Sequence, residues 1–182
     1  PAAEQNAMMK AGFAEMDITP EIGMEQAGGY GKSYHKSIHD PCKVRAVVFD
    51  DGKKRTALVG IDALSVRSNL VEKVRKQIQS RCNIPGEAVL IGASHSHSAG
   101  PVGGVMAGEY DHAGELVRSL AYEKTTTENP EYVKLVEKQL VDVVCQADKN
   151  REETMVGVGI GFEDKVGFNR RFRMKNGITY TH

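Results

Sequence analysis

Residues 88–101 have the sequence AVLIGASHSHSAGP, and the other predicted elements are arranged around this stretch. The apolar run 88–91 predicts a buried strand, and the glycine and proline after the histidines predict a loop. Residues two apart on a strand point to the same face of a sheet. We therefore expect His95 and His97 to converge just beyond a sheet edge, where open α/β sheets hold their ligands.

Helix and strand patterns alternate on both sides of this stretch. Apolar residues recur at helical spacing over 66–81 and, after the N-cap Asn129 and Pro130, as far as 147. A further helix is expected over 109–122. Strands are expected at 10–16, 43–50, 55–62, 88–94 and 154–162, with hairpin turns at Asp51–Gly52 and at 175–177. This order predicts an α/β fold: a mixed β-sheet flanked by helices, with β-hairpins and a central crossover.

The histidine pair has two interpretations. Two neutral imidazoles beside an open loop make half of a metal site, because histidine is the commonest metal ligand near neutral pH. Ser94, Ser96 and Ser98 stand next to the pair and can support such ligands through hydrogen bonds. The alternative is a polar surface without a metal, since an isolated His-x-His pair is a short motif.

The composition is typical of one globular domain and excludes several classes of function. The 182 residues are 40% hydrophobic and 26% charged, with a formal net charge of zero. A chain without a basic field is a poor match for nucleic acid. No apolar run approaches the roughly 18 residues that a membrane span needs. No signal peptide is visible, and a start at Pro1 indicates a processed or trimmed chain.

The three cysteines, Cys42, Cys82 and Cys145, lie far apart in the sequence. None forms a Cys-x-x-Cys pair, so a structural zinc knuckle is not expected. An odd number argues against a full disulfide framework. We expect small side chains that are buried or half-buried.

Other polar residues are also candidates for a site. Asp62 ends a strand, where it could line a site or cap the next helix. His39–Asp40 ends a long loop at 21–41 and is either functional or an exposed pair. In Asn169-Arg170-Arg171, an inward arginine would clamp a carboxylate, a phosphate or a developing oxyanion, and an outward one would be a solvated edge charge.

The glycines at 157, 159 and 161 are not followed by helical spacing, so they indicate a closely packed strand rather than a nucleotide-binding loop. His35 and His112 are given no role, because both lie in polar surroundings.

Four segments together resemble the N-terminal catalytic domain of the neutral/alkaline, non-lysosomal ceramidase family. The histidine segment and the Asn-Arg-Arg segment are the most specific, and the order and separation of all four also match. The four segments are 11–13 through 17–20 (AGF…DITP), 38–41 with 45–46 (IHDP…RA), 94–98 with 100–101 (SHSHS…GP) and 169–171 (NRR).

The resemblance implies a zinc-dependent hydrolase that cleaves the amide bond of ceramide or of a related N-acyl lipid. It implies that His95 is a zinc ligand and that His97, Arg170 and His39 line the catalytic pocket. Residues 1–182 would then be the N-terminal portion of a larger ceramidase-like zinc hydrolase domain, secreted or periplasmic. The family's other zinc ligands, a second His, a Glu and a Tyr, would follow residue 182, so zinc could be absent from this chain. His182 is in the wrong place to be the missing His.

Two alternatives stand beside this interpretation. One is a metal-dependent hydrolase of another small amide or ester, because lipid-binding features are not recognisable in the sequence. The other is a catalytically incomplete fragment whose serine and histidine loop is a polar binding surface. The partners expected are a small-molecule or lipid substrate, without nucleic acid and without a transmembrane segment. The sequence does not give the oligomeric state.

Overall fold

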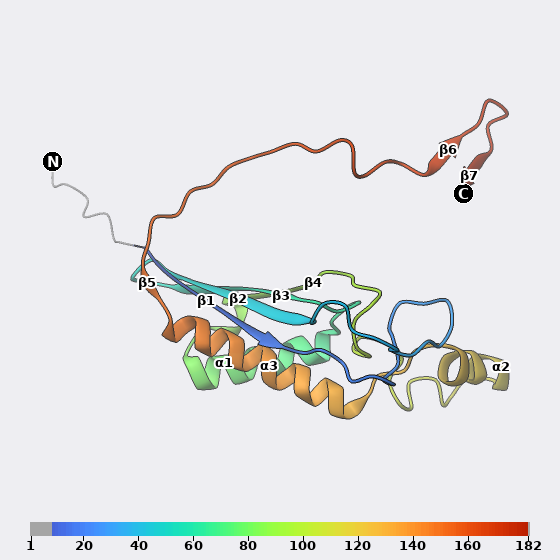
Figure 1. Cartoon of the computed structure of the whole chain (residues 1–182), viewed down its shortest axis with the longest axis horizontal. Helices are drawn as coiled ribbons and strands as arrows, with labels where there is room; N and C mark the ends of the chain where they lie inside the picture. The colour runs from blue at the N-terminus through green and yellow to red at the C-terminus, as the bar shows by residue number, and fades with distance from the viewer. Residues whose placement is uncertain (1–8, 182) are drawn as a thin grey trace.

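The computed structural model describes residues 9–181, so the start of the chain at Pro1 and the expectation on His182 lie outside the described residues. A mixed sheet has the strand order β4-β3-β2-β1-β5, and a separate hairpin pairs β6 with β7. The predicted α/β class is confirmed, with α1 and α3 against one face of the sheet (Figure 1). The strands are β1 (Lys10–Asp17), β2 (Lys43–Asp50), β3 (Arg55–Ile61), β4 (Val89–Ala93), β5 (Glu152–Glu153), β6 (Arg171–Arg173) and β7 (Thr179–Thr181).

The helical elements differ in length and type. None of those described is long and apolar enough to cross a membrane. They are α1 (Ser68–Cys82), the 3₁₀ turn η1 (Gly86–Ala88), α2 (Glu115–Ser119), the π-helical turn η2 (Leu120–Lys124) and α3 (Pro130–Lys149).

The sheet combines antiparallel hairpins with one parallel crossover, as the sequence predicts, but the crossover joins β3 to the edge strand β4 and is not central in the sheet. β2 pairs antiparallel with both β1 and β3, and the turn at Asp51–Gly52 joins β2 to β3. Gly52 has a φ of 82°, which glycine adopts without steric cost. β3 and β4 are parallel, with α1 between them, so the carboxyl ends of both strands lie at one edge of the sheet.

The core lies between the sheet and the two long helices. Buried residues alternate along β3 at Ala57, Val59 and Ile61, which is the pattern of a strand with one covered face. At the start of α3, the side chain of Asn129 accepts hydrogen bonds from two backbone N–H groups, and Pro130 follows it, as predicted. The helices contribute Leu70, Val74 and Ile78 from α1, and Tyr132, Val136, Leu140, Val143 and Val144 among others from α3.

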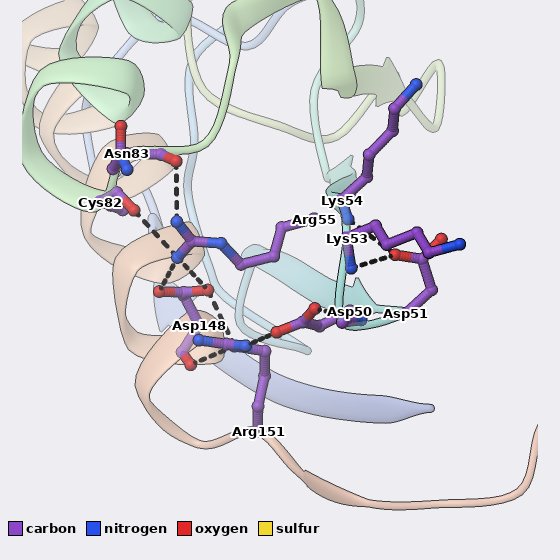
Figure 2. A network of polar contacts seen from close by, with 10 residues as sticks. Asp50, Asp51, Lys53, Lys54, Arg55, Cys82, Asn83, Asp148 and Arg151 are labelled. Carbon is purple, nitrogen blue, oxygen red and sulfur yellow. Dashed lines mark hydrogen bonds and ion pairs between the residues drawn. The ribbon is translucent and has the colours of Figure 1, made fainter. Parts of the chain in front are cut away.

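A network of charged side chains connects the β2–β3 hairpin to the ends of both helices (Figure 2). Arg55 Nη1 donates to both carboxylate oxygens of Asp148, at 2.9 and 3.1 Å, and to the backbone carbonyl of Cys82 at 3.1 Å. Arg151 Nε lies 2.9 Å from Asp148 Oδ1, and Arg151 also pairs with Asp50. Asp148 therefore forms ion pairs with two half-buried arginines and fixes the carboxyl end of α3 against the hairpin.

A disulfide joins Cys82 to Cys145, contrary to the expectation that the cysteines are simply buried or half-buried thiols. The odd number of cysteines does not exclude a disulfide, because Cys42 stays free while the other two cysteines pair. Their Cα atoms lie 5.5 Å apart because α1 packs against α3, a contact that spacing in the sequence does not reveal. Such a bond is compatible with an extracellular location.

One predicted helix is shorter than expected, and one predicted strand is absent. The helix expected over 109–122 is present only as α2 and η2, because the Glu109 carboxylate bonds to Arg67 and to the backbone N–H of Met106 and fixes a turn there. The strand expected over 154–162 is also absent. The last backbone hydrogen bond between this part of the chain and the sheet runs from Thr154 N to Met9 O. After Thr154, no described strand pairs with the segment.

Candidate functional site

The segment after β4 places His95 beside the loop that follows β3. β4 ends at Ala93, and His95 has a left-handed φ of 62°, so strand alternation does not orient its side chain. Instead, His95 Nδ1 lies 3.0 Å from the backbone carbonyl oxygen of Leu64. A carbonyl only accepts hydrogen bonds, so Nδ1 carries the proton in the neutral ring and Nε2 presents its lone pair.

The two histidines converge, as the sequence predicts. His97 Nε2 lies 3.2 Å from His95 Nε2, and the rings meet edge to face with centroids 4.8 Å apart. Because His95 Nε2 has no proton, His97 must donate in this contact. The lone pair of His95 and the N–H of His97 therefore meet each other at an exposed point beyond the sheet edge.

The long loop at 21–41 supports His97 from the other side. The Gln26 side-chain amide donates to the His97 backbone carbonyl at 2.9 Å. Gly28 has a φ of 89°, and a Cβ added there would lie 2.6 Å from His97 Cγ. Only glycine therefore fits beneath the imidazole. Sequence reasoning missed both residues, and the sole signal was the glycine-rich composition of this loop.

His35, which was given no role, is a structural residue of the same loop. It is buried, and its Nε2 lies 3.2 Å from the backbone carbonyl oxygen of Ala99. The backbone N–H of Ala27 donates to the same carbonyl at 3.3 Å. Two contacts from the loop thus hold the chain immediately after the histidine pair.

A cavity of about 890 Å³ opens between this loop and the histidine segment. Ser96 and Ser98 line one wall, and His39 and Asp62 are also among its lining residues. His39 Nδ1 lies 2.7 Å from Asp40 Oδ2, and this hydrogen bond, with the charge of the carboxylate, raises the pKa of the exposed imidazole. His39 is thus a protonatable group at the rim of the cavity.

Asp62 lines the cavity and does not cap the following helix. Its Oδ2 accepts from the backbone N–H of Lys43 at 2.9 Å and from Arg45 Nη1 at 3.2 Å. Arg67 occupies the N-cap position of α1, without a capping side-chain bond. Of the two roles considered for Asp62, the structure therefore favours the wall of the site.

Arg170 is not brought together with the histidines. It immediately precedes β6, at the far end of an arm whose residues 152–181 are all exposed. Figure 1 shows this arm leaving β5 and running apart from the sheet to the β6–β7 hairpin. The structure thus joins His95 to His97, places His39 at the neighbouring cavity, and leaves Arg170 distant.

The donor set fits part of a metal centre. The lone pair of His95 Nε2, with Nδ1 held by a carbonyl, is the arrangement that metal-binding histidines adopt. Within residues 9–181, however, no group of three or more His, Cys, Asp or Glu side chains is placed to hold a metal ion. A zinc centre with three or four protein ligands would need further donors.

Comparison with solved structures identifies what this fold resembles. Neutral ceramidase from Pseudomonas aeruginosa superposes with a TM-score of 0.61 over 82% of this chain, at 18% sequence identity. This chain shares the fold of part of a neutral ceramidase. A ceramidase complexed with C2 gives a TM-score of 0.57 over 81% of the chain, also at 18% identity.

The similarity covers a segment of much larger proteins and is structural. The chain matches 23% of the length of the Pseudomonas ceramidase and 22% of the other. No family model matches the sequence, and no curated protein matches it either. The alignment therefore shows a common fold, and the ceramidase activity belongs to the relatives.

Proposed function

We propose that this chain forms the N-terminal portion of a zinc-dependent hydrolase domain of the neutral ceramidase type. The substrate class is ceramide or a related N-acyl lipid, and the bond cleaved is the amide. The observation that carries the proposal is the convergence of His95 and His97 on a segment whose fold matches a ceramidase. The disulfide supports a secreted or periplasmic location.

His95 is the residue that would hold zinc. Its ring is fixed through Nδ1 by the carbonyl of Leu64, so Nε2 could bind a metal without rotation of the ring once His97 gives up its hydrogen bond to that atom. Zinc in such a site lowers the pKa of a bound water and polarises a carbonyl. Because the described residues assemble no group of three or more possible ligands, the proposal places the remaining ligands elsewhere in the protein.

His97 and His39 would handle protons and hydrogen bonds. His97 Nε2–H, which donates to His95 when no other acceptor is present, is free to donate to a substrate oxygen once His95 binds a metal. His39 at the rim holds its proton more firmly because of Asp40, which suits a donor to an anionic or leaving group.

Arg170 is proposed as the electrostatic component of the pocket. A guanidinium stabilises developing negative charge on a carbonyl oxygen, or binds a substrate headgroup through two parallel N–H bonds. This role requires the arm that carries Arg170 to approach the histidines. The arm is fully exposed, so no described packing opposes that movement.

The test measures zinc content and N-acyl-sphingosine hydrolysis in the protein that carries this chain. His95→Ala should remove zinc and lower kcat/KM by at least about a hundredfold, because the metal supplies several kcal/mol of transition-state stabilisation. His112→Ala, an equivalent truncation outside the cavity, should leave both unchanged. Stoichiometric zinc together with full activity in the His95→Ala protein would refute the proposal.

A second substrate class is favoured by the character of the cavity wall. Many of its residues are polar, among them Lys32, Lys36, Ser33 and Ser37. Such a wall suits a small polar amide or ester better than an acyl chain. The dependence of kcat/KM on acyl length distinguishes the two substrate classes. The kcat/KM of a lipid amidase rises with each added methylene, and that of a small-amide hydrolase does not.

A further inference from the structure

The face of the sheet opposite the helices carries a row of apolar side chains. Phe13 pairs with Val47, Val47 with Leu58, and Leu58 with Leu90, so the four side chains stand side by side across the sheet. Phe13 is 67% exposed, Leu58 42% and Leu90 61%. A continuous row of exposed apolar side chains is typical of a surface that contacts another layer, a partner or a ligand.

A hollow lies directly beside this row. The next residues in register are Gly60 on β3 and Gly92 on β4, and a Cβ added to either would meet no atom within 4 Å. With Phe13, Leu58 and Leu90 they line a groove of about 590 Å³. The groove has room for one or two bulky side chains from a second layer.

The arm after β5 has the complementary pattern. From residue 156 to 162, apolar and glycine residues alternate, which on an extended chain gives one apolar face and one bare face. Three of its side chains are almost completely exposed: Val158 at 94%, Ile160 at 100% and Phe162 at 90%. A strand of this kind, left in water, exposes the side chains that a sheet-on-sheet contact would bury.

We propose that residues 155–162 of the same chain dock on this face, with Val158, Ile160 and Phe162 packed over the apolar row and into the hollow at Gly60 and Gly92. Figure 1 shows that the arm starts at the edge of the same sheet and leaves on the side opposite the helices, where it runs apart from the strands. Eight extended residues reach about 26 Å, and a sheet of five strands is about 19 Å wide, so the segment can cross it.

Attachment to the same sheet favours this occupant over a second copy. β5 pairs with β1, and Thr154 is bonded to Met9, so the docking segment begins one residue from a fixed point. A short tether gives an effective concentration in the millimolar range, above that of a second chain in dilute solution. Docking would also move the chain before Arg170 toward Ser94, which lines the groove. A role for this movement in catalysis rests on the proposed function, whereas docking itself does not.

Disulfide trapping in the full 182-residue chain tests the proposal. In a Cys42→Ser background, Leu58→Cys is combined with Ile160→Cys or, as the matched control, with Gly159→Cys. Docking predicts an intramolecular bond that forms about tenfold faster at 160 than at 159, because neighbouring residues of a strand point to opposite faces. A free arm would form the disulfide at equal rates from positions 160 and 159, and that result would overturn the proposal. Disulfides between two chains, in place of the intramolecular bond, would also overturn it.

Filling the hollow provides a second test that needs no activity. Gly60→Val should slow trapping of the 58–160 pair at least fivefold by occupying the space of an arm side chain. Thr56→Val, an exposed position of β3 outside the groove, should leave the rate unchanged. An unchanged rate in the Gly60→Val chain contradicts docking over the hollow.

Discussion

His97 Nε2 lies 3.2 Å from His95 Nε2, and His95 Nδ1 is held by a backbone carbonyl. The two rings therefore differ in tautomer: His95 presents a lone pair and His97 an N–H. This difference gives each histidine its own proposed role, one as a ligand and the other as a hydrogen-bond donor. We therefore propose that the pair does not act as a symmetrical two-histidine clamp.

Gly28 should be required for the position of His97. Gly28→Ala places a methyl group against the imidazole, whereas Gly23→Ala has a similar φ of 91° and meets no atom within 4 Å. Both substitutions cost about 1–2 kcal/mol of backbone strain. Only Gly28→Ala should shift the His97 imidazole resonances in NMR spectra and reduce hydrolysis. An equal effect of the two variants on His97 would show that the contact is unimportant.

Asp40→Asn should lower the pKa of His39. The carboxylate raises this pKa first by hydrogen bonding and then by charge. A raised folded-state value means that the pair favours the folded state below the ordinary histidine pKa, and that this contribution disappears as pH rises through the raised value. Because both side chains are exposed, the readout is the NMR titration midpoint of His39 rather than stability. Asp111→Asn is the control, and a midpoint unmoved by Asp40→Asn would contradict the prediction.

Reduction of the Cys82–Cys145 disulfide should destabilise the domain. The bond closes a loop with a sequence separation of 63, for which chain entropy gives about 4 kcal/mol and measured cases about 2–4 kcal/mol. Thermal unfolding with and without reductant measures the effect, with Cys82→Ala as the genetic equivalent. Cys42→Ser should change the melting temperature little, since this thiol is free. Identical melting in the oxidised and reduced protein would refute the prediction.

Asp148→Ala should cost more stability than removal of an ordinary surface charge. It leaves Arg55 and Arg151, both half-buried, without their shared carboxylate. We expect a loss of about 2–3 kcal/mol in urea unfolding, below the cost of breaking a fully buried pair. The control, Glu131→Ala, breaks an exposed pair with Lys134 and should cost less than about 1 kcal/mol. A comparable loss for both variants would mean that the network in Figure 2 has no special role.

Local sequence patterns predicted most of the fold. The β-branched apolar runs of β2 and β3, the Asp51–Gly52 turn and the Asn129–Pro130 helix start are encoded within a few residues, and the elements predicted from them are present. The strand expected at 154–162 failed because a strand exists only with a partner, and alternation does not say whether the partner is present. The disulfide was not predicted for a related reason, since its formation depends on how two helices pack.

The candidate site was predicted in part. The approach of His95 to His97 was correct, but the left-handed backbone at His95 and the carbonyl of Leu64 produce it, rather than strand alternation. Gln26 and Gly28 were missed because they lie about seventy residues from His97 in the chain and meet it only after folding. The roles of Arg170 and His39 stay predictions.

The most direct test of the central claim, that His95 Nε2 is a zinc ligand, is long-range ¹H–¹⁵N NMR of the histidines during titration of the 182-residue chain with excess zinc. We predict that His95 is protonated at Nδ1 before zinc is added. Zinc should then shift its Nε2 resonance selectively, and this shift should be retained in His112→Ala and lost in His95→Ala. A His95 ring that is protonated at Nε2 and shows no zinc-dependent shift would contradict the assignment of His95 Nε2 as a zinc ligand.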